Sequence, residues 1–133
     1  MSDPAAVRAA LQKGGVSDIT TRGRRSGRLR RIEIVFHAID GRIYITGMPG
    51  RRDWLANLAA DPRLIFHLKR GPVADLPATA RIVTDPVERR PVMESVTRLW
   101  GRPSQVEAFM ASSPLIEVRF DDPSVLAADS PAV

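Results

Sequence analysis

The sequence contains no cysteine among its 133 residues, which excludes disulfide bonds and cysteine-ligated metal sites. Aromatic residues make up only 5% of the chain and leave few side chains for stacking on nucleic-acid bases. No apolar run approaches the roughly 20 residues that span a bilayer, and the N-terminal segment lacks the apolar stretch of a signal peptide. We therefore expect a cytoplasmic protein without a transmembrane segment.

The sequence also lacks a recognisable set of catalytic or metal-binding side chains. Its only histidines, His37 and His67, fall on mixed faces of predicted strands, without the carboxylate spacing of a metal site. No Ser-His-Asp pattern is present, and Ser26 lies in a loop with no candidate general base to activate it. We predict no catalytic residue and no metal ligand, so any enzymatic chemistry must come from a bound cofactor.

Positive charge, in contrast, is concentrated in one stretch. Six of the ten residues from Arg22 to Arg31 are arginine, and no carboxylate lies between Asp18 and Glu33. Without these arginines the acidic residues would slightly outnumber the basic ones, so the stretch carries the whole positive excess. Gly23 and Gly27 divide it into a loop that can turn backbone N–H groups inward among arginine side chains. This combination is typical of an anion site, with phosphate as the favoured anion.

Three interpretations of the arginine-rich loop stay open on the residues alone. It is a solvated run of charge, a contact for nucleic acid, or the site of a small phosphorylated ligand. Nucleic-acid binding favours a broader basic surface with aromatic residues, and the loop contains no aromatic residue. The glycines inside the run favour a compact anion pocket, which makes a nucleic-acid partner the weaker interpretation.

Strand periodicity dominates the rest of the chain. Alternating or apolar runs predict strands over residues 16–21, 31–39, 42–48, 63–70, 73–84 and 115–120. Asp40-Gly41 is a strong signal for a tight hairpin and excludes a parallel sheet at that point. We predict one mainly β (α+β) domain over residues 1–133, an antiparallel barrel with short helical insertions, an N-terminal helix within residues 1–14 and a flexible tail over residues 122–133.

Further helices are expected between the strands. Asp53 is expected to cap a helix that runs to about residue 60. Asp85 and Glu88 have the spacing of a capping box, and Pro91 is expected to kink or restart the helix that they begin. The residues expected to form the apolar stripe of that helix are Val92, Val96, Leu99 and Trp100.

A second basic, glycine-containing loop spans Met48 to Trp54. It follows the strand that is expected to pair with the strand leaving the arginine-rich loop. A hairpin centred on Asp40-Gly41 places Arg30 roughly opposite Arg51. Because converging like charges are unfavourable unless an anion lies between them, the two loops predict one shared anion site.

The segment Thr20–Arg30 resembles a segment of the deazaflavin-dependent nitroreductase and quinone reductase family. In this chain it reads Thr-Thr-Arg-Gly-Arg-Arg-Ser-Gly-Arg-Leu-Arg. The family pattern is Thr-Thr-x-Gly-Arg-Lys-Ser/Thr-Gly-x-Pro-Arg. Asp40-Gly41 and the segment Trp54–Pro62 resemble its next landmarks, an Asp-Gly turn and a Trp-x-x-Asn-Leu-x-x-x-Pro helix. The resemblance covers about residues 18–84. It implies a six-stranded split β-barrel of the FMN-binding, pyridoxamine phosphate oxidase (PNPOx-like) type, with the deazaflavin coenzyme F420 bound along a basic groove.

The same resemblance implies a set of cofactor-binding residues. Those expected at the phosphate and lactyl-glutamyl tail of coenzyme F420 are Arg24, Arg25, Ser26, Gly27, Arg28 and Arg30. Those expected along the deazaflavin ring are Thr46, Gly47 and Met48. Those expected in the second loop and in the helix behind it are Arg51, Arg52, Trp54 and Asn57.

The implied function is hydride transfer from reduced deazaflavin to a small electron-poor acceptor such as a quinone, an enone or a nitro compound. Three alternatives stay open: an FMN-dependent oxidoreductase, a cofactor carrier that turns nothing over, and nucleic-acid binding through the arginine-rich loop. We also expect a homodimer formed through the mixed strand faces that carry Val35, Ile39 and Ile65.

Overall fold

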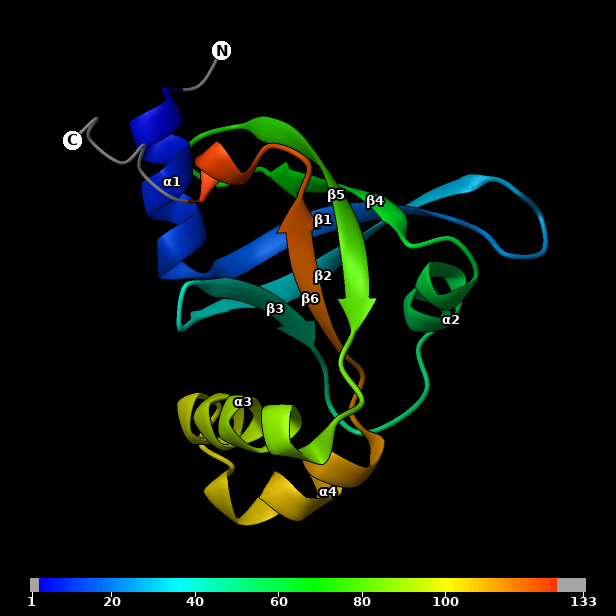
Figure 1. Ribbon diagram of the computed structural model, residues 1–133, viewed down its shortest axis with the longest axis vertical. Helices are drawn as coiled ribbons and strands as arrows, with labels where there is room; N and C mark the ends of the chain where they lie inside the picture. The colour runs from blue at the N-terminus through cyan, green and yellow to red at the C-terminus, as the bar shows by residue number, and fades with distance from the viewer. Residues whose placement is uncertain (1–2, 127–133) are drawn as a thin grey trace.

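The computed structural model describes residues 3–126, and six strands within them close into an antiparallel barrel (Figure 1). The order around the barrel is β1-β2-β3-β6-β5-β4, and β4 returns to pair with β1. The strands are β1 (Gly15–Arg22), β2 (Leu29–Ile39), β3 (Arg42–Thr46), β4 (Arg63–Leu68), β5 (Ala74–Ile82) and β6 (Leu115–Phe120). The predicted six-stranded antiparallel barrel is therefore confirmed.

The β2–β3 hairpin turns at Asp40-Gly41, as predicted. Both residues have positive φ, 52° at Asp40 and 75° at Gly41, as a two-residue turn of the I′ type requires. The β2–β3 ladder keeps the predicted register but ends at Phe36 and Ile45, because strand β3 stops at Thr46. The predicted position of Arg30 opposite Arg51 is therefore wrong, because the two strands do not pair that far from the turn.

In the described part of the chain, four α-helices and two short 3-10 helices surround the barrel. They are α1 (Pro4–Lys13), α2 (Asp53–Ala60), α3 (Pro86–Leu99), η1 (Pro103–Gln105), α4 (Val106–Ser112) and η2 (Pro123–Val125). In Figure 1, α1 and the α3–α4 pair lie at opposite ends of the molecule, with α2 beside the barrel near the β1–β2 connection. Residues 127–133 of the predicted tail lie outside the described residues.

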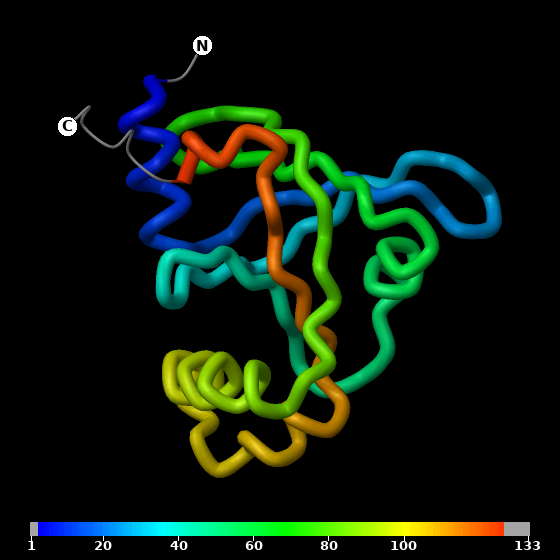
Figure 2. The backbone as a smooth tube through the Cα atoms, in the orientation of Figure 1, coloured from blue at the N-terminus to red at the C-terminus, as the bar shows by residue number. Residues whose placement is uncertain are grey.

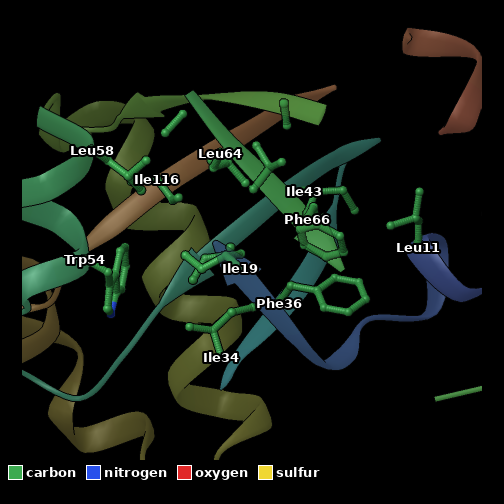
Figure 3. Close-up of a cluster of buried hydrophobic side chains, with 14 of the residues drawn as sticks. Leu11, Ile19, Ile34, Phe36, Ile43, Trp54, Leu58, Leu64, Phe66 and Ile116 are labelled. Carbon is green, nitrogen blue, oxygen red and sulfur yellow. The ribbon is translucent and has the colours of Figure 1, made fainter. Parts of the chain in front are cut away.

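The barrel interior is a continuous apolar core (Figure 3). Phe66 is fully buried and packs edge-to-face against Phe36 and Phe120, with ring centroids 5.0 and 5.5 Å apart. An aromatic side chain buried in this way contributes about 1.5–3 kcal/mol from area alone. Trp54 of α2 joins the same core, and this contact fixes α2 against the barrel.

A second apolar cluster holds the α3–α4 pair against β3 and β6. Its buried members are Tyr44, Val83, Val92, Met93, Val96, Phe109 and Leu115. Ile39, which was expected on a dimer face, packs against this cluster. The pair is therefore a rigid part of the fold, and its loops have defined positions relative to the barrel.

The starts of two helices differ from the prediction. Asp53 is the first residue of α2 and makes no side-chain cap, so the predicted cap is wrong. Asp85 does cap α3 by accepting a hydrogen bond from the backbone N–H two residues on. Glu88 does not complete the capping box, because Arg81 donates to its carboxylate at 2.9 Å. A tertiary ion pair therefore replaces the local contact.

Helix α3 also continues through Pro91, so the predicted restart is absent. Pro91 lies on the exposed side of the helix, where a missing backbone N–H is readily tolerated. The predicted stripe is wrong at Leu99, which is 69% exposed. The buried side instead comprises Arg89, Val92, Met93, Val96 and Thr97, because the barrel lies on that side of the helix.

Candidate functional site

The arginine-rich loop connects β1 to β2 and holds its own shape. Gly23 N–H donates to the Arg28 carbonyl at 2.8 Å, and Gly27, with φ of 72°, donates back to the Gly23 carbonyl at 2.9 Å. The Ser26 hydroxyl accepts from Arg28 N–H at 3.1 Å. A Cβ atom on Gly23 would lie 2.8 Å from that hydroxyl, so only glycine fits there without a shift. The two glycines thus produce a compact turn, as the sequence predicted.

Helix α2 fixes this loop through Asn57. The Asn57 side-chain oxygen accepts from Arg24 N–H at 3.1 Å and from Arg24 Nη1 at 2.9 Å. Asn57 is only 4% exposed, and it lies one turn after Trp54 on the same side of α2. Trp54 anchors the helix in the core while Asn57 holds Arg24. Figure 2 shows the result, a β1–β2 connection that extends past the barrel beside α2.

Three arginines of the loop, Arg25, Arg28 and Arg30, keep side chains without a hydrogen bond or ion pair to any residue between 3 and 126. Arg31, the neighbour of Arg30, points to the other face of β2 and donates to Asp18 at 2.9 Å. A pocket of about 180 Å³ lies beside the unpaired groups. Its lining residues are Gly23, Arg24, Arg25, Ser26, Arg30, Asp53 and Asn57.

Carboxylates near the loop are already engaged elsewhere. Hydrogen bonds from Arg63 lower the pKa of Asp61, which follows α2, to about 2. Hydrogen bonds from Lys69 and Arg31 likewise lower the pKa of Asp18. Asp53 lines the pocket and lies 3.5 Å from Arg24. The charge of the unpaired arginines is therefore not neutralised by the acidic residues around them.

The two arginines of the second basic loop differ in their hydrogen bonding. Arg52 folds back and donates to the carbonyls of Met48 at 2.9 Å and Arg51 at 3.1 Å. Its guanidinium lies so close to Gly47 that a Cβ there would come within 3.1 Å of Nη2. Arg52 therefore closes the loop, while Arg51 is exposed and has no side-chain partner among the residues that the structure describes.

The residues expected along the ring lie at the base of this loop. Thr46 is buried, and its hydroxyl donates to the Pro114 carbonyl at 2.5 Å. Gly47 is half-buried and Met48 is exposed. None of the three lines the pockets described here, so the structure leaves them beside the site rather than at its centre.

Two further pockets meet at the second loop. A basic pocket of about 700 Å³ is lined by Arg24, Arg25, Arg51, Arg52, Asp53, Leu55, Ala56, Ala59 and Ile82. A more apolar pocket of about 570 Å³ is lined by Gly50, Arg51, Leu55, Thr84, Arg89, Met110, Ala111, Ser112, Ser113 and Pro114. Arg51 and Leu55 belong to both. The two basic loops therefore converge across α2, and an apolar pocket adjoins their meeting point.

One arrangement was invisible in the sequence. On the outer face of the barrel, His67 Nε2 lies 2.6 Å from the Thr20 hydroxyl, and His67 Nδ1 lies 2.6 Å from the Asp75 carboxylate. The order resembles a nucleophile, a base and an orienting acid. Thr20 lies within strand β1, and none of the three residues lines the pockets above, so we assign the group to cross-strand stabilisation. Only the β1–β4–β5 pairing brings these residues together.

Two other observations concern metal binding and membrane insertion. Within residues 3–126, no three histidine, cysteine or carboxylate side chains gather in a group that could hold a metal ion. Over the same range, every helix is too short or too polar to cross a membrane.

The fold and the site define a small antiparallel barrel on which two basic loops converge beside an apolar pocket. The chain belongs to the F420H(2)-dependent quinone reductase family, whose model matches residues 4–123. The name of that family describes an oxidoreductase. The resemblance predicted from Thr20–Arg30 is thereby confirmed for its quinone reductase part.

Solved structures support the fold. A conserved hypothetical protein from Mycobacterium tuberculosis is 20% identical, with a TM-score of 0.71 over 100% of this chain and 92% of that one. A protein described as a pyridoxamine 5'-phosphate oxidase, from Listeria innocua, is 12% identical, with a TM-score of 0.63 over 89% and 90%. An F420 reductase is 16% identical, with a TM-score of 0.62 over 86% and 93%. At these identities the likeness shows the PNPOx-like fold alone. No curated protein matches the chain.

Proposed function

We propose that this protein binds coenzyme F420 across its two basic loops and passes a hydride from the reduced coenzyme to a small electron-poor acceptor, with a quinone as the first candidate. The observation that carries the proposal is the pair of adjoining pockets. One is basic, the other is apolar, and both contain Arg51. The family to which the chain belongs supports the choice of coenzyme.

The anionic tail of the coenzyme fits the arginine-rich loop. Arg25, Arg28 and Arg30 are available because no described residue pairs with their side chains. Arg24 is pre-positioned by Asn57, so it loses little conformational freedom when an anion binds. Guanidinium groups bind phosphate and carboxylate oxygens with two parallel hydrogen bonds, which suits a phosphorylated, glutamylated tail.

The ring end of the coenzyme fits the apolar part of the basic pocket, which Leu55, Ala56 and Ala59 of α2 provide. Residues Thr46–Met48 would form the edge of the ring site. Their contribution would come from the backbone and the Met48 side chain, since the Thr46 hydroxyl is bound to the Pro114 carbonyl.

The acceptor fits the apolar pocket next to Arg51. Reduced deazaflavin supplies the hydride, so the protein needs only to hold both partners at close range and in line. Arg51 would stabilise negative charge that develops on the acceptor, because it lines both pockets and its side chain has no partner among residues 3–126. Arg52 is less available, since it already donates to two carbonyls of its own loop.

The test mixes the purified protein with reduced F420 or, separately, reduced FMN, and with menadione, an enone or a nitroaromatic compound as acceptor. We expect enzyme-dependent reoxidation of F420 with menadione, and a loss of that activity in Arg51→Met. Arg70→Met, which alters an exposed arginine outside both pockets, should keep full activity.

Other outcomes would overturn parts of the proposal. Turnover with reduced FMN alone would replace the coenzyme. Tight F420 binding with no turnover on any acceptor would identify a carrier. A gel shift with duplex DNA that survives about 0.15 M salt would favour nucleic-acid binding through the arginine-rich loop.

A further inference from the structure

Arg89 of α3 is a buried cation without a buried anion. It is 9% exposed, and no carboxylate within residues 3–126 pairs with it. Burial lowers the pKa of its guanidinium, as expected when a charge leaves water without a counter-charge. An unpaired buried charge is costly, so the bonds that it makes must serve a purpose that an apolar side chain could not.

Among the described residues, all of the side-chain hydrogen bonds of Arg89 go to main-chain carbonyls. Nη1 donates to Val83 at 2.9 Å, in the connection between β5 and α3. Nη2 lies 3.1 Å from the carbonyls of Phe109 and Met110 and 2.9 Å from that of Ser113. The last three lie at the C-terminal end of α4, where the helix dipole is negative. The Phe109 carbonyl already accepts from the Ser113 N–H at 3.0 Å, whereas the Met110 carbonyl lacks a helical partner because Pro114, four residues on, has no N–H. Arg89 therefore caps α4 from inside the protein.

The segment that Arg89 caps is also the wall of the apolar pocket. Met110, Ser113 and the residues between and after them line that pocket. The same wall makes one contact with the second basic loop and one with the end of strand β3, which leads into that loop. Gly50 N–H donates to the Ser112 carbonyl at 3.0 Å, and the Thr46 hydroxyl donates to the Pro114 carbonyl at 2.5 Å. A continuous set of contacts thus runs from Arg89 to the loop that carries Arg51.

We infer that Arg89 is a positioning residue that fixes the wall of the acceptor pocket and, through Ser112 and Gly50, the place of Arg51. This inference rests on the proposed function, because it gives the apolar pocket the role of acceptor site. Arg89 also lines the apolar pocket, but its guanidinium is engaged by four backbone carbonyls, so we give it a positioning role rather than a direct contact with the reacting groups. It sets how far the acceptor lies from the coenzyme, and small displacements of that kind lower rates strongly.

The geometry explains why arginine is needed at this position. The guanidinium fork reaches Val83 from one side and Ser113 from the other, and a lysine ammonium presents its donors from a single point. Arg89→Lys therefore keeps the charge but cannot hold both carbonyls. Arg90 is the matched control, because it also links α3 to α4, donating to Glu107 at 2.8 Å, yet it lines neither pocket of the proposed site.

The experiment compares wild type, Arg89→Lys, Arg89→Met and Arg90→Met. It measures the F420 dissociation constant by fluorescence, kcat and KM for menadione, and hydrogen exchange of the Gly50 amide. For Arg89→Lys we expect an F420 affinity within about twofold of wild type, a fall in kcat/KM for menadione of about tenfold or more, and faster exchange at Gly50. Arg90→Met should match wild type in all three. If Arg89→Met does not fold, Arg89→Lys alone decides.

The inference would be overturned if Arg89→Lys kept the same kcat/KM for menadione as the wild-type protein. It would also be overturned if hydrogen exchange at the Gly50 amide were unchanged in that variant. Equal effects in Arg90→Met would also overturn it, because any link between the two helices would then suffice. If the wild-type protein turns over no acceptor, the proposed function fails by itself. The exchange measurement still decides the positioning role in that case, since it needs neither coenzyme nor acceptor.

Discussion

Two neighbouring arginines on β2 allow a sharp test of the anion site. Arg30 lines the pocket beside Asn57 and has no side-chain partner among the described residues, whereas Arg31 faces the other way and donates to Asp18. Arg30→Ala therefore removes a free charge from the proposed site. Arg31→Ala removes a charge of the same sign from the adjacent residue, but one that is already compensated.

General interaction energies give the expected size of each effect. A charge-assisted hydrogen bond to the coenzyme tail contributes about 1.5–3 kcal/mol, so Arg30→Ala should weaken F420 binding by about 10- to 150-fold. A charge roughly 10 Å away in water changes the energy by only about 0.4 kcal/mol before salt screening, so Arg31→Ala should change the affinity by no more than about twofold. Lys69 lies 2.7 Å from Asp18 and does not depend on Arg31, so the local fold should be preserved in that variant.

The assay is a titration of each variant with oxidised F420, followed by coenzyme fluorescence at low and at physiological salt. Equal weakening in both variants would mean that the loop acts only through its overall charge. Unchanged affinity in both would place the anionic tail elsewhere. Either result would refute the division of roles read from the pocket lining.

Three further predictions concern other parts of the molecule. Asp53→Asn should tighten F420 binding several-fold in the same titration, because the Asp53 carboxylate lies 3.5 Å from Arg24 and competes with the ligand; weaker binding would contradict this. Burial lowers the pKa of His37, so the folded protein binds fewer protons than the unfolded chain, and stability should decrease as pH falls from about 7.5 through that lowered pKa. Thermal unfolding of wild type and His37→Leu at several pH values tests this, since the variant should lose that part of the dependence. A homodimer should form through the exposed strand face that carries Val35 and Ile65, and a monomer mass by light scattering at micromolar concentrations would exclude it.

Local signals account for the parts of the fold that the sequence predicted well. Alternation in Ile32–Ile39 and the Asp40-Gly41 turn specify a strand and a hairpin without reference to distant residues. The face of α3 was predicted less well, because a pattern of apolar residues does not say where the barrel lies. Leu99 fits the helical period and is nevertheless exposed, while Thr97 is buried. Burial here follows tertiary packing rather than the pattern.

The site shows a similar limit. The sequence indicated both basic loops, and the resemblance indicated that Asn57 belongs with them. The Arg24–Asn57 contact spans 33 residues and depends on how α2 docks against the barrel. The difference between Arg51 and Arg52 was not readable, since only the fold shows which guanidinium lies against Gly47. Arg89 gave no signal, because its partners are backbone carbonyls and carry no side-chain pattern.

The number of arginines in the arginine-rich loop exceeds the number available to a ligand, because some of them bind other residues of the protein. Arg22 donates to the Gly27 carbonyl, Arg24 to Asn57 and Arg31 to Asp18, so these side chains shape or anchor the loop. Those left without a described partner are Arg25, Arg28, Arg30 and, in the second loop, Arg51. All but Arg28 line the pockets beside α2. We therefore propose that the ligand is recognised by the arginines that folding leaves unpaired, and that the position of those residues, more than the net charge of the loop, decides which anion fits.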